Sequence, residues 1–208
     1  MPGAKIVMFH RALRLELHSA VGLTLIELLF TIAVFSIAAA ISMAATRDAL
    51  DELRTAMAAR YLAGRVMQAR IEAVRRSACI ALRFEPTTDD YRFASFRDGN
   101  GNGIRAADIR AGIDVPLSGF EQMRDKFAGI RFGLMTGLPD VDGSPATGGD
   151  GVRIGTARIL TMSPDGTATA GTLYLRSRRG QYAVRVLGAT GRVRVLQYRP
   201  GDGTWVTR

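Results

Sequence analysis

The stretch Gly22–Ala45, with the sequence GLTLIELLFTIAVFSIAAAISMAA, decides how the rest of the chain is interpreted. Between Leu23 and Ala45 the only charged residue is Glu27, and there is no proline. A helix of these 23 residues is about 35 Å long, and the hydrocarbon core of a bilayer is about 30 Å thick. The sequence therefore predicts a transmembrane helix over residues 23–45.

Glu27 is the one residue that does not suit this environment. A carboxylate inside a membrane span costs about 2.5–3.5 kcal/mol and usually has a specific partner. If the chain were cut after Gly22, the new α-amino group of Leu23 would pair with Glu27 of a neighbouring copy. The alternative is that Glu27 lies close enough to the end of the span to reach the membrane interface.

The residues Gly22–Leu29, GLTLIELL, resemble the class III signal of type IV pilins and pseudopilins, usually written GFTLIELL. Leu23 stands where this family usually has Phe. The resemblance implies that residues 1–22 are a leader, cleaved between Gly22 and Leu23 by a prepilin peptidase. It also implies N-methylation of Leu23 and a role for Glu27 in filament assembly.

The leader carries three basic residues and one acidic residue before the span, namely Lys5, Arg11, Arg14 and Glu16. Positive charge holds its end of a span in the cytoplasm. We therefore expect a single-pass protein of the bacterial inner membrane, with a cytoplasmic N-terminus and a periplasmic C-terminal domain. The alternative is an ordinary secretory signal, cut at the small residues of 38–40 or 43–45.

Residues 46–78 continue the helical pattern, so one helix of about 50 residues is predicted over 23–77. Apolar residues recur at spacings of three and four, and we expect this stripe to pack onto a domain. Its members are Leu50, Leu53, Met57, Tyr61, Gly64, Met67, Ile71, Val74 and Ala78.

Residues 79–208 show short β-like runs separated by turn residues, which predicts a β-rich globular domain. The expected fold class is α+β, a long N-terminal helix packed on an antiparallel sheet, which is also the pilin-like architecture that the resemblance implies. The predicted strands are Ile80–Glu85, Tyr91–Arg97, Ala128–Leu134, Arg158–Met162, Thr172–Arg178, Gln181–Leu187 and Arg192–Tyr198.

The composition disfavours several kinds of catalytic site. Both histidines, His10 and His18, lie in the leader, so the mature chain would lack histidine for acid–base catalysis or metal binding. Cys79 is the only cysteine, which excludes an intrachain disulfide. A membrane-anchored enzyme is a further alternative, and no motif in the sequence supports it. We predict a protein that is not an enzyme and has no cofactor or metal.

The loop Asp98–Gly103, DGNGNG, begins like a calcium-binding loop, with oxygen-bearing side chains at alternate positions and glycine at the sixth. The twelfth position, which needs a bidentate Glu, is Ile109. The same residues also form ordinary tight turns. Calcium binding between Asp98 and Asn102 and a plain turn are both open alternatives.

The C-terminal part of the chain is basic. Between Leu175 and Arg208 there are eight arginines and one acidic residue, Asp202, in a chain of net charge +9. A spacing of two residues puts Arg176 and Arg178 on one face of their strand, and it puts Arg192 and Arg194 on one face of theirs. Such a face is suited to phosphates, or it is a solvated outer face that acidic lipid head groups or an acidic neighbouring subunit would also satisfy.

Thr190–Arg194, TGRVR, is similar to the closing segment of the GspH/FimT family of minor pseudopilins. The resemblance implies a structural subunit of a type II secretion pseudopilus, with other pseudopilins and secreted proteins as partners. The alternative is a minor pilin of type IV pili that binds DNA during uptake through a GRxR motif, here Gly191, Arg192 and Arg194.

Overall fold

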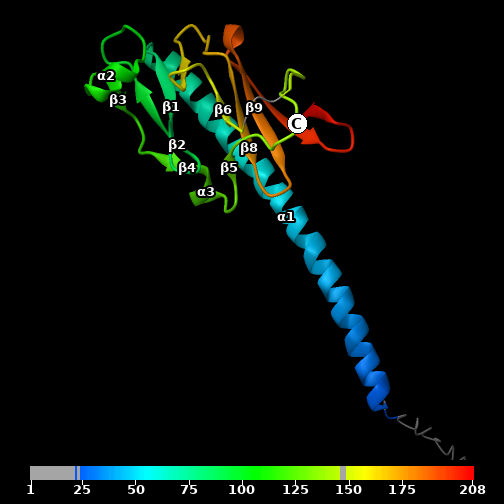
Figure 1. Ribbon diagram of the computed structural model, residues 1–208. Coiled ribbons are helices and arrows are strands. Elements are labelled where there is room, and N and C mark those ends of the chain that lie inside the picture. Colours follow the sequence, from blue (N-terminus) through cyan, green and yellow to red (C-terminus); the bar gives the residue numbers. More distant parts are fainter. Residues whose placement is uncertain (1–21, 23, 146–148) are drawn as a thin grey trace, which may run out of the picture. The chain divides into compact units, whose positions relative to one another are not determined.

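The computed structural model describes residues 22, 24–145 and 149–208 (Figure 1). The chain divides into two compact units, Met1–Met43 and Ala44–Arg208, and each is described by itself. The predicted leader lies outside the described residues except for Gly22, and Leu23 also lies outside them.

The first helix, α1, spans Leu25–Arg76 and confirms the long predicted helix. Thr24 precedes the helix, and its carbonyl accepts the first helical hydrogen bond, from Leu28 N–H at 3.0 Å. The helix ends where Ser77 adopts a left-handed conformation, with φ of 49°. That conformation allows Ala78 N–H to reach back to the Ala73 carbonyl at 3.3 Å, which closes the last turn.

The β-structure forms two antiparallel sheets in place of the single sheet that was predicted. The first has the order β3-β2-β1-β7, with β4 also paired to β2, and the second has the order β11-β10-β9-β8-β5, with β6 also paired to β8. The first sheet comprises β1 (Ile80–Pro86), β2 (Tyr91–Arg97), β3 (Val115–Pro116), β4 (Glu121–Gln122) and β7 (Ile159–Met162). The second comprises β5 (Arg131–Phe132), β6 (Val152–Arg153), β8 (Gly171–Arg176), β9 (Gln181–Leu187), β10 (Arg192–Arg199) and β11 (Thr204–Thr207).

Three short helical segments complete the described structure: α2 (Ala106–Arg110), α3 (Met123–Lys126) and η1 (Gly188–Thr190). The predicted strand over 128–134 shrinks to Arg131–Phe132. Gly129 and Gly133 on either side have φ of 82° and 156°, conformations that interrupt an extended run. The α+β class, a long N-terminal helix followed by antiparallel sheets, is confirmed.

The face of α1 that packs on the sheets is not the predicted stripe, and this prediction is wrong. Leu50, Leu53, Met57, Gly64, Met67, Ile71 and Val74 are exposed, while Tyr61 and Ala78 are half-buried. The buried residues are Thr55, Ala58, Ala59, Leu62, Val66, Ala69 and Ala73. At about 100° per residue this second stripe lies on the opposite side of the helix.

The core lies between this alanine-rich face of α1 and the inner faces of both sheets. The first sheet contributes residues such as Leu82 and Phe93, and the second contributes residues such as Leu173 and Val184. Small side chains on the helix let the sheets approach closely, so the large apolar residues of the core come mostly from the strands.

Candidate functional site

The predicted assembly residues lie at the start of α1. Gly22 is exposed and precedes the helix. The hydroxyl of Thr24 accepts a hydrogen bond from the backbone N–H of Glu27 at 3.3 Å, which is one half of a capping box. Glu27 lies in the first turn, where the helix dipole favours negative charge. Within the part of the chain that the structure describes, its carboxylate contacts no other polar side chain.

The first unit carries the apolar segment of α1. Its large side chains point outward, with Leu25 77% and Phe35 74% exposed. Thr31 and Ser36 donate their hydroxyl hydrogens to carbonyls one turn earlier, at 2.8 and 2.7 Å. The helix thus satisfies these hydroxyls internally, as a hydrocarbon environment requires. Among the described residues, α1 is the one helix long and apolar enough to cross a membrane.

In the second unit, the outward face of α1 forms a second apolar surface, which we call the outer stripe. Its large members are each 37–59% exposed: Leu50, Leu53, Met57, Met67, Ile71 and Val74. With Gly64 they occupy a and d positions of a heptad, and Arg60 stands at the d position between Met57 and Gly64. A row of exposed large apolar residues along one helix face is a candidate site of interaction.

The arginines predicted to form an anion-binding face do not form one row. Arg176 ends β8, and its pairing partners are Arg131 on β5 and Gln181 on β9. Arg194 on β10 pairs with Arg185, which lies four residues along β9 from Gln181. Four residues of strand span about 13 Å. The structure therefore divides these side chains into two groups, at the two ends of the second sheet.

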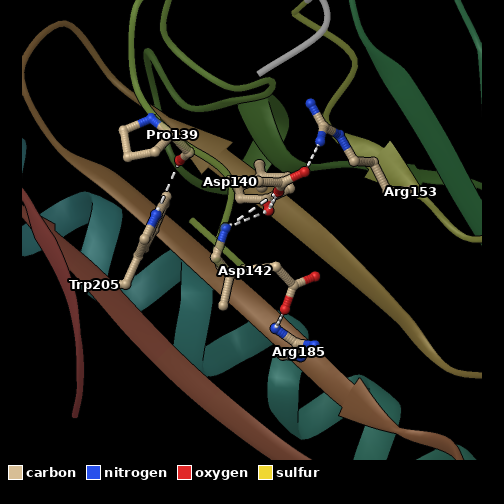
Figure 2. Close-up of polar contacts among 8 residues, drawn as sticks. Pro139, Asp140, Asp142, Arg153, Arg185 and Trp205 are labelled. Atoms are coloured by element: carbon tan, nitrogen blue, oxygen red, sulfur yellow. Dashed lines mark hydrogen bonds and ion pairs between the residues drawn. The ribbon is translucent and has the colours of Figure 1, made fainter. Parts of the chain in front are cut away.

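A loop lies over the middle of that sheet face, where Pro139 contacts Trp205 and Asp140 contacts Arg153 (Figure 2). The Trp205 ring N–H donates to the Pro139 carbonyl at 3.0 Å. Asp140 accepts hydrogen bonds from Arg153 and from the hydroxyl of the buried Tyr174. The segment 137–145 therefore closes a small apolar cluster on the outside of the sheet.

Arg178 lies apart from both strands, at the tip of the β8–β9 hairpin. Its guanidinium contacts the Asp48 carboxylate of α1 at 2.7 Å. The predicted pairing of Arg176 with Arg178 on one strand face is wrong, because β8 ends at Arg176. Arg192 and Arg194 both lie on β10, two residues apart, and both are exposed.

Gly191, the first residue of the GRxR segment, has a structural role. Its φ is 57°, and a side-chain Cβ there would lie 2.4 Å from the Gly166 carbonyl and 2.8 Å from Nε of Arg70. Arg70 lies on α1 and donates to that same carbonyl at 3.3 Å. Glycine at this position is therefore explained by packing against α1, without a ligand.

The Asp98 loop forms a turn around its own carboxylate. One oxygen of Asp98 accepts backbone hydrogen bonds from Asn100 and Gly101 at 3.1 and 2.8 Å, and the other accepts one from Gly103 at 2.7 Å. In residues 22, 24–145 and 149–208 no three acidic, histidine or cysteine side chains are grouped as a metal site requires. The turn interpretation accounts for this loop's residues.

Two arginines that the sequence did not single out belong to these groups. Arg131 and Arg185 come beside Arg176 and Arg194 through strand pairing alone. No signal near Arg131 in the sequence identifies its partner, because residues 131 and 176 are 45 positions apart.

No family model matches the sequence, and no curated protein matches it. Two solved structures of the minor pseudopilin EpsH from the type II secretion system of Vibrio cholerae are similar to the chain. One has a TM-score of 0.44 and 14% identity over 69% of this chain and 97% of its own. The other has a TM-score of 0.38 and 12% identity over 75% of this chain and 94% of its own.

Proposed function

We propose that this chain is a minor pseudopilin, a membrane-anchored structural subunit of a type II secretion pseudopilus. One observation carries the proposal: the segment Gly22–Leu29 opens the helix that is apolar and long enough to cross a membrane, and Thr24 caps it. In this proposal prepilin peptidase cuts between Gly22 and Leu23, Leu23 is methylated, and residues 1–22 are lost.

The proposed mechanism is the exchange of lipid contacts for helix contacts. The apolar segment of α1 holds the subunit in the inner membrane, with residues 46–208 in the periplasm. In the filament the amine of Leu23 pairs with Glu27 of a neighbouring subunit, which offsets the cost of about 2.5–3.5 kcal/mol for a carboxylate in lipid. The outer stripe then packs against the helix of a neighbouring pseudopilin, as its heptad spacing suits.

The type IV pilus alternative needs a nucleic-acid site at Gly191, Arg192 and Arg194. Gly191 is accounted for by its contact with Gly166 and Arg70. The two arginines are exposed, as charged residues on an outer strand commonly are. No specific observation favours DNA binding, so we do not propose it.

The native N-terminus tests the proposal. Intact-mass analysis of the chain extracted from its native membrane should give a protein that begins at Leu23 and carries one methyl group. Gly22→Val should retain the leader, whereas Val21→Ala, the neighbouring control, should be processed. A native chain that still begins at Met1, or is cut within residues 38–45, would overturn the proposal.

Assembly is tested separately. Glu27→Gln should be processed and inserted but should fail to cross-link to other pseudopilins in the membrane. Ile71→Ser, in the outer stripe, should weaken the same cross-links, whereas Ser77→Ala, exposed beyond the stripe, should not. Cross-linking of Glu27→Gln at the native level would contradict the assigned role of Glu27.

A further inference from the structure

A basic hollow at the end of the second sheet has no role in the function proposed above. It has a volume of about 270 Å³ and is lined by Arg131, Arg176, Arg178, Gly129 and Ser177. The lining residues include three arginines and no acidic residue, and one of these arginines, Arg178, is paired with Asp48. Guanidinium groups bind phosphate through paired hydrogen bonds, so the hollow has the chemistry of a phosphate site.

Two of these arginines lie directly opposite each other in the sheet. Arg131 of β5 and Arg176 of β8 are register partners. Like charges in this position destabilise a strand pair. The contact of Arg131 with Asp89 is long, at 3.7 Å, and Asp89 makes a shorter contact of 3.0 Å with Arg124. An anion bound between Arg131 and Arg176 would offset their repulsion.

The hollow lies beside the first turns of α1 in the second unit. Ser177, which lines the hollow, donates its hydroxyl hydrogen to Asp51 at 2.6 Å. Arg178 and Arg179 both contact the Asp48 carboxylate at 2.7 Å. These contacts fix the β8–β9 hairpin tip against residues 48 and 51 of the helix.

Asp48 follows the predicted end of the membrane span, Ala45, by three residues. Three residues of helix rise about 4.5 Å, and the headgroup layer on each side of the hydrocarbon core is about 5–8 Å thick. With the span ending at Ala45 as proposed, Asp48 lies within the headgroup layer, and the hairpin tip contacts Asp48. Arg47, Arg178 and Arg179 are exposed there as well.

We propose that this hollow binds the phosphate of an anionic phospholipid at the membrane surface where α1 leaves the bilayer. The inference rests on the membrane anchoring in the proposed function. The occupant is a lipid headgroup because Arg178 of the hollow contacts Asp48, three residues beyond the predicted span, whereas Arg192 and Arg194, at the other end of the sheet, are not part of it. Bound lipid would hold the domain at the membrane before assembly.

The test uses the full chain in non-ionic detergent micelles. Short-chain phosphatidylglycerol is titrated by calorimetry, with phosphatidylcholine, inorganic phosphate and a short DNA duplex as the other probes. We expect phosphatidylglycerol to bind more tightly than each of the others. Arg131→Gln/Arg176→Gln should weaken its binding about thirtyfold at low salt, or roughly fivefold for each arginine.

Matched variants separate the hollow from general basic charge. Arg131→Lys/Arg176→Lys keeps the charge and should keep most of the affinity, and Arg192→Gln/Arg194→Gln should bind like the wild type. Should the glutamine pair fail to fold, Arg131→Gln alone, at a side chain that is 49% exposed, should still weaken binding about fivefold.

Three outcomes would overturn the inference: equal binding of phosphatidylglycerol and phosphatidylcholine, equal loss in the Arg192/Arg194 variant, or equal or tighter binding of phosphate or DNA to the hollow. Failure of the proposed function is seen independently. A native chain released from its membrane by alkaline carbonate would refute the anchoring, whatever the hollow binds.

Discussion

Two leucines on α1 provide a sharp test of which helix face packs in the domain. Leu62 is fully buried against both sheets, whereas Leu53 is 52% exposed in the outer stripe. The same substitution, Leu→Ala, is made at each position, so the change in intrinsic helix propensity is the same. Any difference in the free energy of unfolding then comes from packing.

The expected magnitudes are far apart. Leu62→Ala leaves a cavity in a close-packed core, which costs about 2–5 kcal/mol. Leu53→Ala removes a surface side chain, which costs about 0.5 kcal/mol or less. For a unit of this size a loss of about 3 kcal/mol lowers Tm by about 6–12 °C, whereas the surface change lowers it by about 2 °C at most.

The assay is thermal unfolding of the full chain in non-ionic micelles, followed by near-UV circular dichroism and by the fluorescence of Trp205. Trp205 is the single tryptophan, and it packs on Tyr174 and Tyr198 in the folded domain. Equal losses for the two variants, or a larger loss for Leu53→Ala, would show that the outer stripe faces the core and would refute the assignment.

Three further predictions follow from individual contacts. Gly191→Ala should destabilise the domain by more than about 2 kcal/mol in the same melt, because it adds a clash with the Gly166 carbonyl at 2.4 Å to the cost of about 1–2 kcal/mol for a left-handed residue. Gly101 has a φ of 76°, and a Cβ added there would meet open space, so Gly101→Ala should show only the destabilisation that comes from the left-handed conformation. Burial, and then the hydrogen bond that Tyr91 donates to Asp150, raise the pKa of Tyr91 from 10.0 to about 12. The neutral phenol is thus favoured in the folded state, so its stabilisation is complete below pH 10 and is lost as pH rises toward about 12. Tyr91→Phe should remove that part of the alkaline destabilisation, measured by unfolding between these pH values; an unchanged profile would contradict it. Finally, Arg192→Ala/Arg194→Ala should bind a short DNA duplex no more weakly than the wild type in a gel-shift assay at physiological salt, and a selective loss in the variant would favour the DNA-uptake alternative.

The sequence predicts the elements that have strong local patterns. α1 follows from a long run of residues without proline, and β2 and β9 have the predicted bounds, Tyr91–Arg97 and Gln181–Leu187. The backbone hydrogen bonds of α1 join residues that are close in the chain, and β2 and β9 are long strands with a clear sequence pattern. The local pattern is therefore enough to predict these elements.

Elements that depend on distant contacts were not predicted. β3, β4 and β6 are two residues long and exist because β2 and β8 provide partners. β11 was not predicted either, since it forms only by pairing with the end of β10. The division of the arginines into two groups depends on strand register and on the loop that covers Tyr174, and neither has a signature in the sequence.

The wrong assignment of the α1 stripe has an instructive cause. The helix carries two apolar stripes with helical periodicity, and the larger side chains favour the wrong one. Periodicity identifies a face but does not say what covers it. The buried face consists largely of alanines, because the sheets approach it closely and supply the bulk of the core.

The outer stripe cannot be explained by the stability of the domain that bears it, since exposed leucine, methionine and isoleucine bury no surface there. Lipid does not explain it either. With the span ending at Ala45 as proposed, Ile71 lies 26 residues beyond it, about 39 Å along the helix, and a headgroup layer is only about 5–8 Å thick. Water or another protein must therefore cover Met67, Ile71 and Val74, and their heptad spacing with Leu50, Leu53 and Met57 suits another helix. The distribution of side chains around α1 thus favours a subunit whose helix is shared between its own domain and a neighbour.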